Sequence, residues 1–224
     1  NSTFTGIPIT GISTAGGVDL VRNARARGIN VTAEVTPHHL TMTEDWILGE
    51  KGEEASFEIL TSNAYETRAK VSPPLRTEHD REALIQGLRE GTIDAIATDH
   101  APHTFGDKAV PFDQASVGIS VLETAFGSLM TLVNAGLIDL PSLLHRLTVG
   151  PGSILGEKYK TIANLQTGSF ADVVLIDVQE KWKVDTKNFY SKGKNTPLES
   201  SELCGKVKLT IANGQIAFED ISCA

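Results

Sequence analysis

The sequence contains little cysteine and no long apolar run. Two of its 224 residues are cysteines, Cys204 and Cys223, and both lie near the end of the sequence without a CxxC spacing. They cannot form a disulfide framework or a cysteine-based zinc site, so any metal has to be held by histidine and carboxylate side chains. No apolar stretch approaches the roughly 20 residues of a membrane span, and no membrane association is expected.

Basic residues are also scarce relative to acidic ones. The chain carries 20 Lys and Arg against 28 Asp and Glu, a formal charge of −8. This balance argues against a nucleic-acid partner, because phosphate binding requires a basic face. The first residues, NSTFTG, lack the basic and apolar regions of a signal peptide, so a soluble cytoplasmic protein is expected.

Residues 1–157 alternate between apolar strands and amphipathic helices, which predicts an α/β fold with a parallel sheet. The candidate strands lie within the stretches 7–14, 29–39 and 92–103, and the candidate helices are 16–28, 78–91, 118–136 and 139–156. In such folds the chemistry lies at the carboxyl ends of the strands, where this sequence places polar residues. Three strands cannot close an eight-stranded barrel, so the sheet is either small and open or part of something longer.

Residues 158–224 have a different pattern and form a predicted second domain. The stretches 171–178 and 206–218 are rich in β-branched and apolar residues, and Asn213-Gly214 lies between two apolar runs as a hairpin turn. A small β-rich domain is therefore expected here, next to the α/β domain of residues 1–157.

The stretch IATDHAPHT, residues 96–104, carries the strongest chemical signal. Asp99 lies at the end of a buried strand, and His100 and His103 follow it in a turn. A carboxylate in this place can bind a cation or move a proton, and a histidine four residues later can hold an anion. The alternative is an aspartate that caps the turn, with histidines that are merely at the surface.

Several segments in order resemble those of one family. They are VTAEVTPHHL, PPLR, ATDHAPHT, GISVLETA, TGSFADVVLID and SKGKNTPL. Together they resemble the class I dihydroorotases of the amidohydrolase superfamily, over nearly all of the chain. The resemblance implies a TIM-like (β/α)8 metal-dependent hydrolase barrel, of which this chain would hold the last strands and helices only. It also implies a small β-rich composite domain built from both chain ends.

The resemblance also implies an activity and a set of site residues. Class I dihydroorotases interconvert L-dihydroorotate and N-carbamoyl-L-aspartate in de novo pyrimidine biosynthesis, using one or two zinc ions and a zinc-bound hydroxide. By this match Asp99 would be both a metal ligand and the general acid/base. His103 would bind the substrate carboxylate, the backbone of Val117 and Gly118 would contact the ring, and Ser72 takes a position often held by a substrate-binding Asn.

Because the sequence departs from the family pattern, three hypotheses about its function remain open. The other metal ligands of the family precede the segment seen here, and Gly11 in GIST stands where a further ligand His is expected. The chain is then part of a dihydroorotase that is inactive alone, another cyclic amidase such as an allantoinase or hydantoinase, or a non-catalytic scaffold or partner subunit. The resemblance suggests a homo-oligomer, and an aspartate transcarbamoylase is among the partners of some relatives.

Four other polar residues are expected to have supporting roles. His38 and His39 are not ligands in the family, so we expect them to be structural or to support site residues. Glu123 is predicted to be a hydrogen-bonding group on the helix 118–136. Arg76 is predicted to anchor its loop through a salt bridge.

Overall fold

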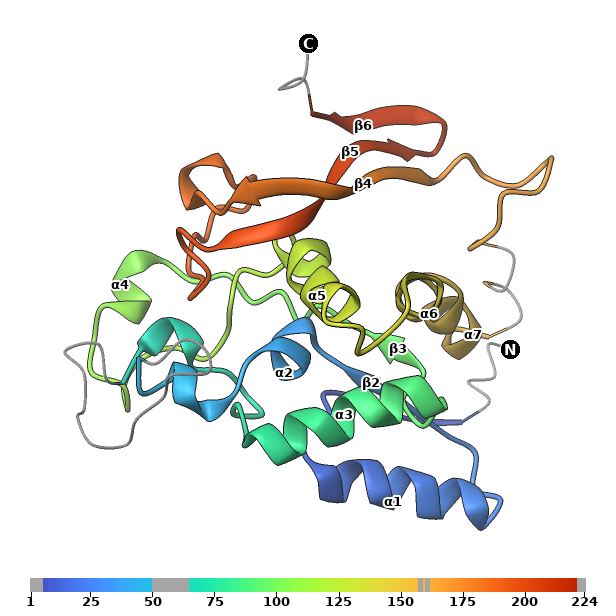
Figure 1. The fold of residues 1–224 in the computed structure, drawn as a ribbon, viewed down its shortest axis with the longest axis horizontal. Coiled ribbons are helices and arrows are strands. Elements are labelled where there is room, and N and C mark those ends of the chain that lie inside the picture. Colours follow the sequence, from blue (N-terminus) through green and yellow to red (C-terminus); the bar gives the residue numbers. More distant parts are fainter. Residues whose placement is uncertain (1–5, 50–64, 157–158, 160–161, 221–224) are drawn as a thin grey trace.

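The computed structural model describes residues 6–49, 65–156, 159 and 162–220, and Figure 1 shows their arrangement. Three short strands form a parallel sheet, as the sequence predicts, and their order is β1-β2-β3. They are β1 (Ile7–Ile9), β2 (Val31–Val35) and β3 (Ala95–Ile96). In the described part of the chain this sheet is open and does not close into a barrel.

Two capped helices cover one side of the parallel sheet. Helix α1 (Ala15–Ala26) starts at Thr14, whose side chain accepts the Gly17 N–H, and α3 (Glu78–Glu90) ends at Gly91 in the left-handed conformation. Their apolar faces enter one buried core with the strands. Both helices lie close to the predicted ranges.

The helices that follow β3 differ from the prediction. The expected helix 118–136 begins only at Ala125, because Ile119 pairs with the chain beside His100, where the Ala101 N–H donates to the Ile119 carbonyl, and residues 122–124 form a turn. The expected helix 139–156 is broken at Thr148, which is not helical. The helices here are α4 (Phe105–Lys108), α5 (Ala125–Asn134), α6 (Leu140–Leu147) and α7 (Val149–Ile154).

Short helical turns connect the larger elements. Helix α2 (Pro37–Thr41) follows β2 directly, with Pro37 in its first turn and the Thr36 side chain as its cap. The 3-10 turns are η1 (Glu44–Trp46), η2 (Thr67–Ala69) and η4 (Thr186–Asn188). Much of the acidic connection between η1 and η2 lies outside the described residues.

The C-terminal strands form an antiparallel sheet, and we call this sheet, together with the connection 184–201 between its first two strands, the β module. Its strands are β4 (Val173–Lys183), β5 (Glu202–Ala212) and β6 (Gln215–Glu219). The predicted hairpin at Asn213-Gly214 is confirmed: both residues have positive φ, 51° and 74°, as a type I′ turn requires. The expected boundary between residues 157 and 158 falls at residues outside the described part.

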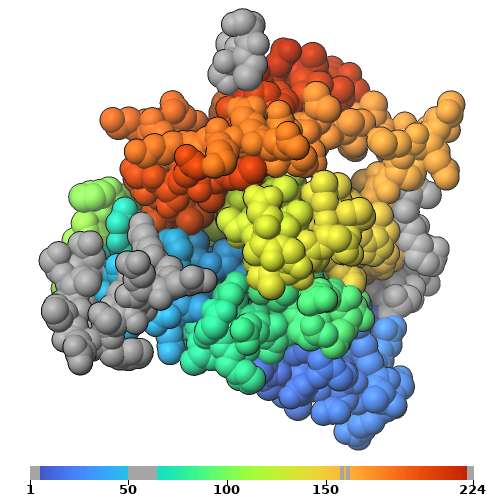
Figure 2. Space-filling view, in the orientation of Figure 1, coloured from blue at the N-terminus to red at the C-terminus, as the bar shows by residue number. Residues whose placement is uncertain are grey.

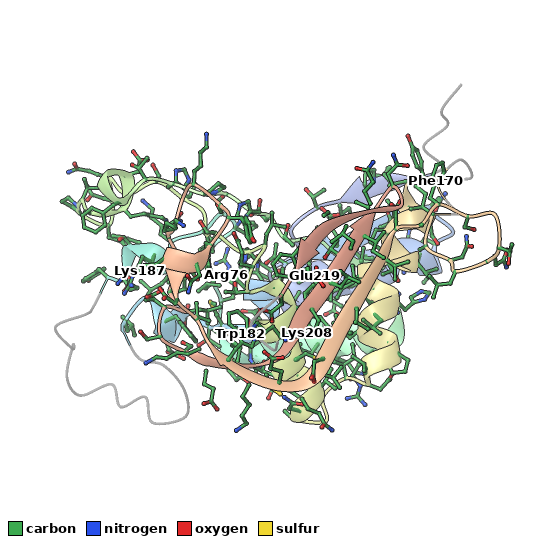
Figure 3. All side chains as sticks on the ribbon, turned by 90° about the horizontal axis from the view of Figure 1, so that it is seen from above. Arg76, Phe170, Trp182, Lys187, Lys208 and Glu219 are labelled. Atoms are coloured by element: carbon green, nitrogen blue, oxygen red, sulfur yellow. The ribbon has the colours of Figure 1, made fainter. Side chains whose placement is uncertain are left out.

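The β module packs directly on α5. Figures 1 and 2 show its orange and red strands over the yellow helix, and Figure 3 shows them from above. Glycines permit the close contact, since a Cβ on Gly205 would lie 2.7 Å from Met130 and one on Gly127 would lie 3.2 Å from Leu203. A second buried core joins Leu203 and other module residues to the segment before α5. None of the described helices has the length and apolarity of a membrane-spanning segment.

Candidate functional site

Asp99 lies just beyond the carboxyl end of β3. It is exposed and has a positive φ of 48°, a conformation that Asp tolerates better than most residues. Glu34 lies near the same end of the neighbouring strand β2, in register with Ala95. Burial, and then the charge of Asp99, raise the pKa of Glu34. Two carboxylates therefore share this edge of the sheet.

His103, Val117 and Gly118, which we call the His103 rim, lie together. The His103 Nε2–H donates to the Val117 carbonyl oxygen at 2.8 Å. Gly118 has a φ of 137°, and a Cβ there would lie 2.5 Å from the Ala101 Cβ and 3.1 Å from the His103 Nε2. Three of the predicted substrate-binding residues therefore lie together, although Val117 and Gly118 follow His103 by 14 and 15 residues in the sequence.

Ser72 belongs to a second loop, which is held by His39. The side chain of Ser72 is exposed and makes no hydrogen bond to any described residue. The next residue, Pro73, accepts a hydrogen bond from the His39 Nε2 at 3.0 Å. The His39 Nδ1 lies 2.7 Å from the Thr36 hydroxyl. His39 therefore has the supporting role that the sequence predicts.

Gly11, where the family pattern places a histidine, faces this loop. An added Cβ would lie 3.4 Å from the Pro73 Cδ, and the backbone at Gly11 has a φ of 64°. Residues with a side chain rarely adopt this conformation, and a histidine here would be strained. The backbone at Gly11 is therefore adapted to glycine.

The histidine pair on α2 is buried and has lowered pKa values. His38 is 2% exposed, and both of its ring nitrogens lack a hydrogen-bond partner among the described residues. Burial, with a smaller effect of His39, lowers the pKa of His38 to about 3. Burial also lowers the pKa of His39, against the raising effects of the Pro73 carbonyl and the Asp99 charge. Both imidazoles are therefore neutral at pH 7.

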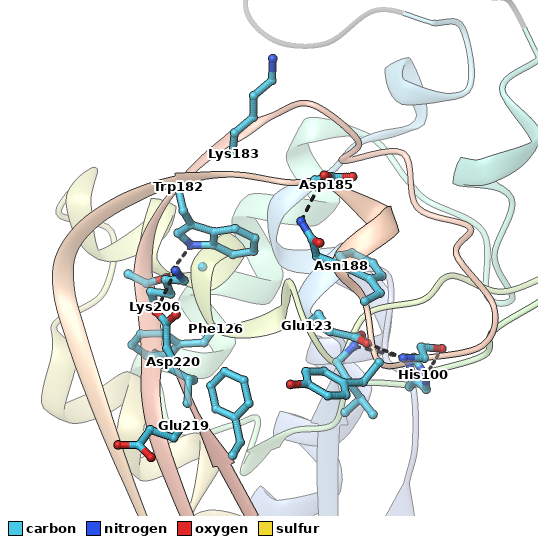
Figure 4. Close-up of a pocket in the computed structure, with 18 residues that line it drawn as sticks. His100, Glu123, Phe126, Trp182, Lys183, Asp185, Asn188, Lys206, Glu219 and Asp220 are labelled. Atoms are coloured by element: carbon cyan, nitrogen blue, oxygen red, sulfur yellow. Dashed lines mark hydrogen bonds and ion pairs between the residues drawn. The ribbon is translucent and has the colours of Figure 1, made fainter. Parts of the chain in front are cut away.

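His100 and Glu123 line a cavity of about 990 Å³ between the segment before α5 and the β module, shown in Figure 4. The His100 Nδ1 accepts the N–H groups of Val121 and Leu122, so its Nε2–H faces the Ser191 hydroxyl at 3.3 Å. Glu123 Oε1 accepts the Ser191 N–H at 2.8 Å. Glu123 is thus a hydrogen-bonding group as predicted, but it lies in the turn before α5 and not on a helix.

Arg76 differs from its predicted role. It is exposed and forms no ion pair with any described residue. Its carbonyl accepts the Glu44 N–H at 2.9 Å, so the backbone provides the link between the two segments. The guanidinium acts at a distance on His39, whose pKa it lowers slightly.

Two residues whose contacts the sequence did not show lie at the His103 rim or next to it. Lys108 is 4% exposed and donates to the carbonyls of Thr67, Lys70 and Ser116. Asn195, which is 6% exposed, contacts the rim from the β module. The signals were present, because Lys108 lies in the loop after His103 and Asn195 lies in the segment SKGKNTPL, but neither shows its partners in the sequence.

The described residues do not by themselves fit a zinc site. Within the described part of the chain, no group of three or more His, Cys, Asp or Glu side chains is placed to hold a metal ion. Catalytic zinc uses three protein ligands in most enzymes. Asp99 can supply one, and Gly11 supplies none.

The fold is that of the hydantoinases and dihydropyrimidinases, over part of their length. A dihydropyrimidinase from Brevibacillus agri matches with a TM-score of 0.81 and 20% identity, covering 96% of this chain and 45% of that one. An L-hydantoinase from Arthrobacter aurescens matches with a TM-score of 0.81 and 28% identity, covering 95% and 44%. No family model matches the sequence.

In its amino-acid sequence, the chain is related to dihydroorotases. The dihydroorotase of Caldanaerobacter subterraneus subsp. tengcongensis is 46% identical over 213 residues, which are 94% of this chain and 45% of the relative. That of Syntrophus aciditrophicus is 41% identical over 212 residues, 95% and 46% of the two chains. The chain is a dihydroorotase homologue, and it spans a little under half of the length of these relatives.

Proposed function

We propose that the chain is the part of a dihydroorotase that holds the substrate and moves the proton. The observation that carries the proposal is the His103 rim, where an imidazole, a carbonyl and a glycine backbone meet, four residues along the chain from the exposed Asp99. The reaction would interconvert L-dihydroorotate and N-carbamoyl-L-aspartate. The relatives at 41 to 46% identity support this substrate over others.

The residues divide the chemistry between them. In ring opening, the amide C–N bond breaks, the oxygen of a water bonds to the carbonyl carbon, and the ring nitrogen takes a proton. Asp99 would accept the proton from the water and return it to the nitrogen. The His103 ring would bind the substrate carboxylate, and the Val117 and Gly118 backbone would orient the ring. Ser72 would supply one further hydrogen bond.

The metal part of the proposal concerns Asp99 alone. We propose Asp99 as one zinc ligand, in line with the sequence resemblance. The described residues lack the remaining ligands, so those would have to come from outside them. On this proposal the 224 residues alone do not turn over dihydroorotate.

The test is ligand binding, because it does not require turnover. Calorimetry would compare L-dihydroorotate with dihydrouracil, which has the same ring without the carboxylate. We expect the chain to prefer dihydroorotate, and His103→Ala to reduce that preference about tenfold or more, as for a hydrogen bond to a charged group. His79→Ala, at an exposed position on α3, is the matched control and should change nothing.

The other outcomes decide between the remaining readings. Equal binding of the two ligands would favour another cyclic amidase, in line with the hydantoinase fold. A folded chain that binds neither ligand would favour a non-catalytic scaffold or partner subunit. Two observations favour the scaffold as the second candidate function. Gly11 stands where a ligand histidine is expected, and the described residues contain no metal-binding group.

A further inference from the structure

Asn195 contacts both sides of the His103 rim from the β module. Its Oδ1 accepts the backbone N–H of His103 at 2.6 Å. Its Nδ2 donates to the carbonyl oxygen of Gly118 at 2.9 Å. Residues 103 and 118 are far apart along the loop that joins them, and one side chain from a third segment connects them.

The surroundings of Asn195 fix this connection. The Ser120 hydroxyl, which has one hydrogen, donates to the Gly193 carbonyl at 2.7 Å and lies 3.1 Å from Asn195 Oδ1, and the Ser120 N–H donates to the Asn195 carbonyl at 2.8 Å. The His103 N–H at Oδ1 and the Gly118 carbonyl at Nδ2 settle which end of the amide is which.

The backbone of this segment lies directly on the turn that carries His103. A Cβ on Gly193 would lie 2.5 Å from the Pro102 Cβ and 2.8 Å from the His103 nitrogen, so the close approach requires glycine. Asn195 is almost fully buried, and a buried amide that is hydrogen-bonded at both its oxygen and its nitrogen restricts its neighbours to one arrangement.

We infer that Asn195 is a positioning residue, through which the β module sets the separation and orientation of His103 and Gly118. The side chain bridges the two backbones, and Ser120 and Gly193 keep the bridge in place. The inference deepens the proposed function and rests on it, since it assigns to the β module control over how the substrate carboxylate and ring are held.

Hydrogen exchange of the 224-residue chain, resolved at single amides, tests the bridge without any ligand. Asn195→Asp keeps an oxygen that accepts the His103 N–H and removes the donor to the Gly118 carbonyl. We expect exchange at residues 117–119 to rise about tenfold, the effect of one lost hydrogen bond, while the His103 amide stays protected. Asn195→Leu should release both the His103 amide and residues 117–119.

Two matched variants complete the experiment. Asn188→Asp changes an exposed Asn in the connection between β4 and β5, to which Asn195 also belongs. Asn188 bonds only to Asp185 among the described residues, and its substitution should leave the rim unchanged. Ser120→Ala removes one contact to Asn195 Oδ1 and should have a smaller effect than Asn195→Leu. If Asn195→Leu fails to fold, the one-atom Asn195→Asp change and Ser120→Ala still decide the question.

The results separate this inference from the proposed function. Unchanged exchange in Asn195→Asp, or an equal rise over the whole chain, would overturn the positioning role. If exchange rises only at residues 117–119, the calorimetric preference for dihydroorotate over dihydrouracil should fall by a similar factor. A local rise in exchange without any change in ligand preference would uphold the bridge and contradict the role of the rim in substrate binding.

Discussion

His38 is buried on α2 with two ring nitrogens that have no partner among the described residues. Its pKa is lowered from 6.5 to about 3, chiefly by burial. Because the folded chain resists protonation and the unfolded chain does not, the unfolded state binds more protons below about pH 6.5. The stability that depends on a neutral His38 is therefore complete above this pH and is lost as the pH falls toward 3.

We therefore expect His38→Leu to flatten the acid side of the stability curve. In the original chain, His38 should lower the free energy of unfolding by an amount on the order of 3 kcal/mol between pH 7 and pH 4. Leucine has no titrating group, and the substitution removes no side-chain hydrogen bond to a described residue. Urea unfolding at a series of pH values measures the difference, and two parallel curves for the original chain and the variant would contradict it.

At the residue scale, the sequence predicted individual site residues but not the contacts that hold them. Asp99 and His103 were found because they follow a strand end at a short spacing, and the structure places them there. Asn195 was not found, because its role comes from two backbone groups that lie 92 and 77 residues away in the chain. Gly118 was assigned through the family resemblance, and its positive φ gives a physical reason for glycine.

Lys108 ends helix α4 and holds the loop after His103 to the segment of η2. Its Nζ reaches three carbonyl oxygens, and burial lowers its pKa to about 8. Lys108→Met keeps the apolar stem and leaves the carbonyls without their donor. We expect it to lower the free energy of unfolding by about 1 to 3 kcal/mol, measured by urea unfolding. Lys183→Met, at an exposed lysine of β4, is the control and should stay near the original value.

Gly87 marks the place where α3 packs most closely on α1. A Cβ at Gly87 would lie 2.9 Å from a methyl carbon of Val18, whereas one at Gly16 would meet nothing within 4 Å. Alanine raises helix propensity at both positions, so packing decides the sign. We expect Gly87→Ala to destabilise by roughly 1 to 3 kcal/mol and Gly16→Ala to stabilise by about 0.5 kcal/mol in thermal unfolding. Equal effects of the two changes would disprove the packing argument.

At the element scale, strands and capped helices were predictable and the segments joined by tertiary contacts were not. α1, α3 and the β5–β6 hairpin have periodic apolar faces and clear stop signals, and they appear where expected. Residues 118–124 also have a helical apolar pattern. They form an extended segment and then a turn, because Ile119 pairs with the chain beside His100, a contact between positions 19 residues apart. Local propensity carries no information about such a contact.

The size of the chain relative to its relatives sets the expectation for the whole molecule. It spans a little under half of their length, and its described residues lack a metal-binding group of three ligands. We therefore expect purified chain to bind less than one zinc ion per molecule and to show no turnover of dihydroorotate. Elemental analysis together with intact mass measures the first, and one full equivalent of zinc that Asp99→Ala removes would contradict it.

Self-association is the second property that belongs to the whole molecule. We propose that the chain forms homo-oligomers, since β1 is an edge strand of the sheet that the described residues form and its Ile7 is 61% exposed. An uncovered edge offers backbone groups for pairing with another chain, and a charge on the edge blocks this. Ile7→Lys should then shift the sedimentation-velocity profile toward monomer. Leu20→Lys places the same charge on the exposed face of α1, where Leu20 is 72% exposed, and should not. Equal shifts in the two variants would mean that net charge and not the strand edge controls association, and a monomeric original chain at all concentrations would rule out the oligomer.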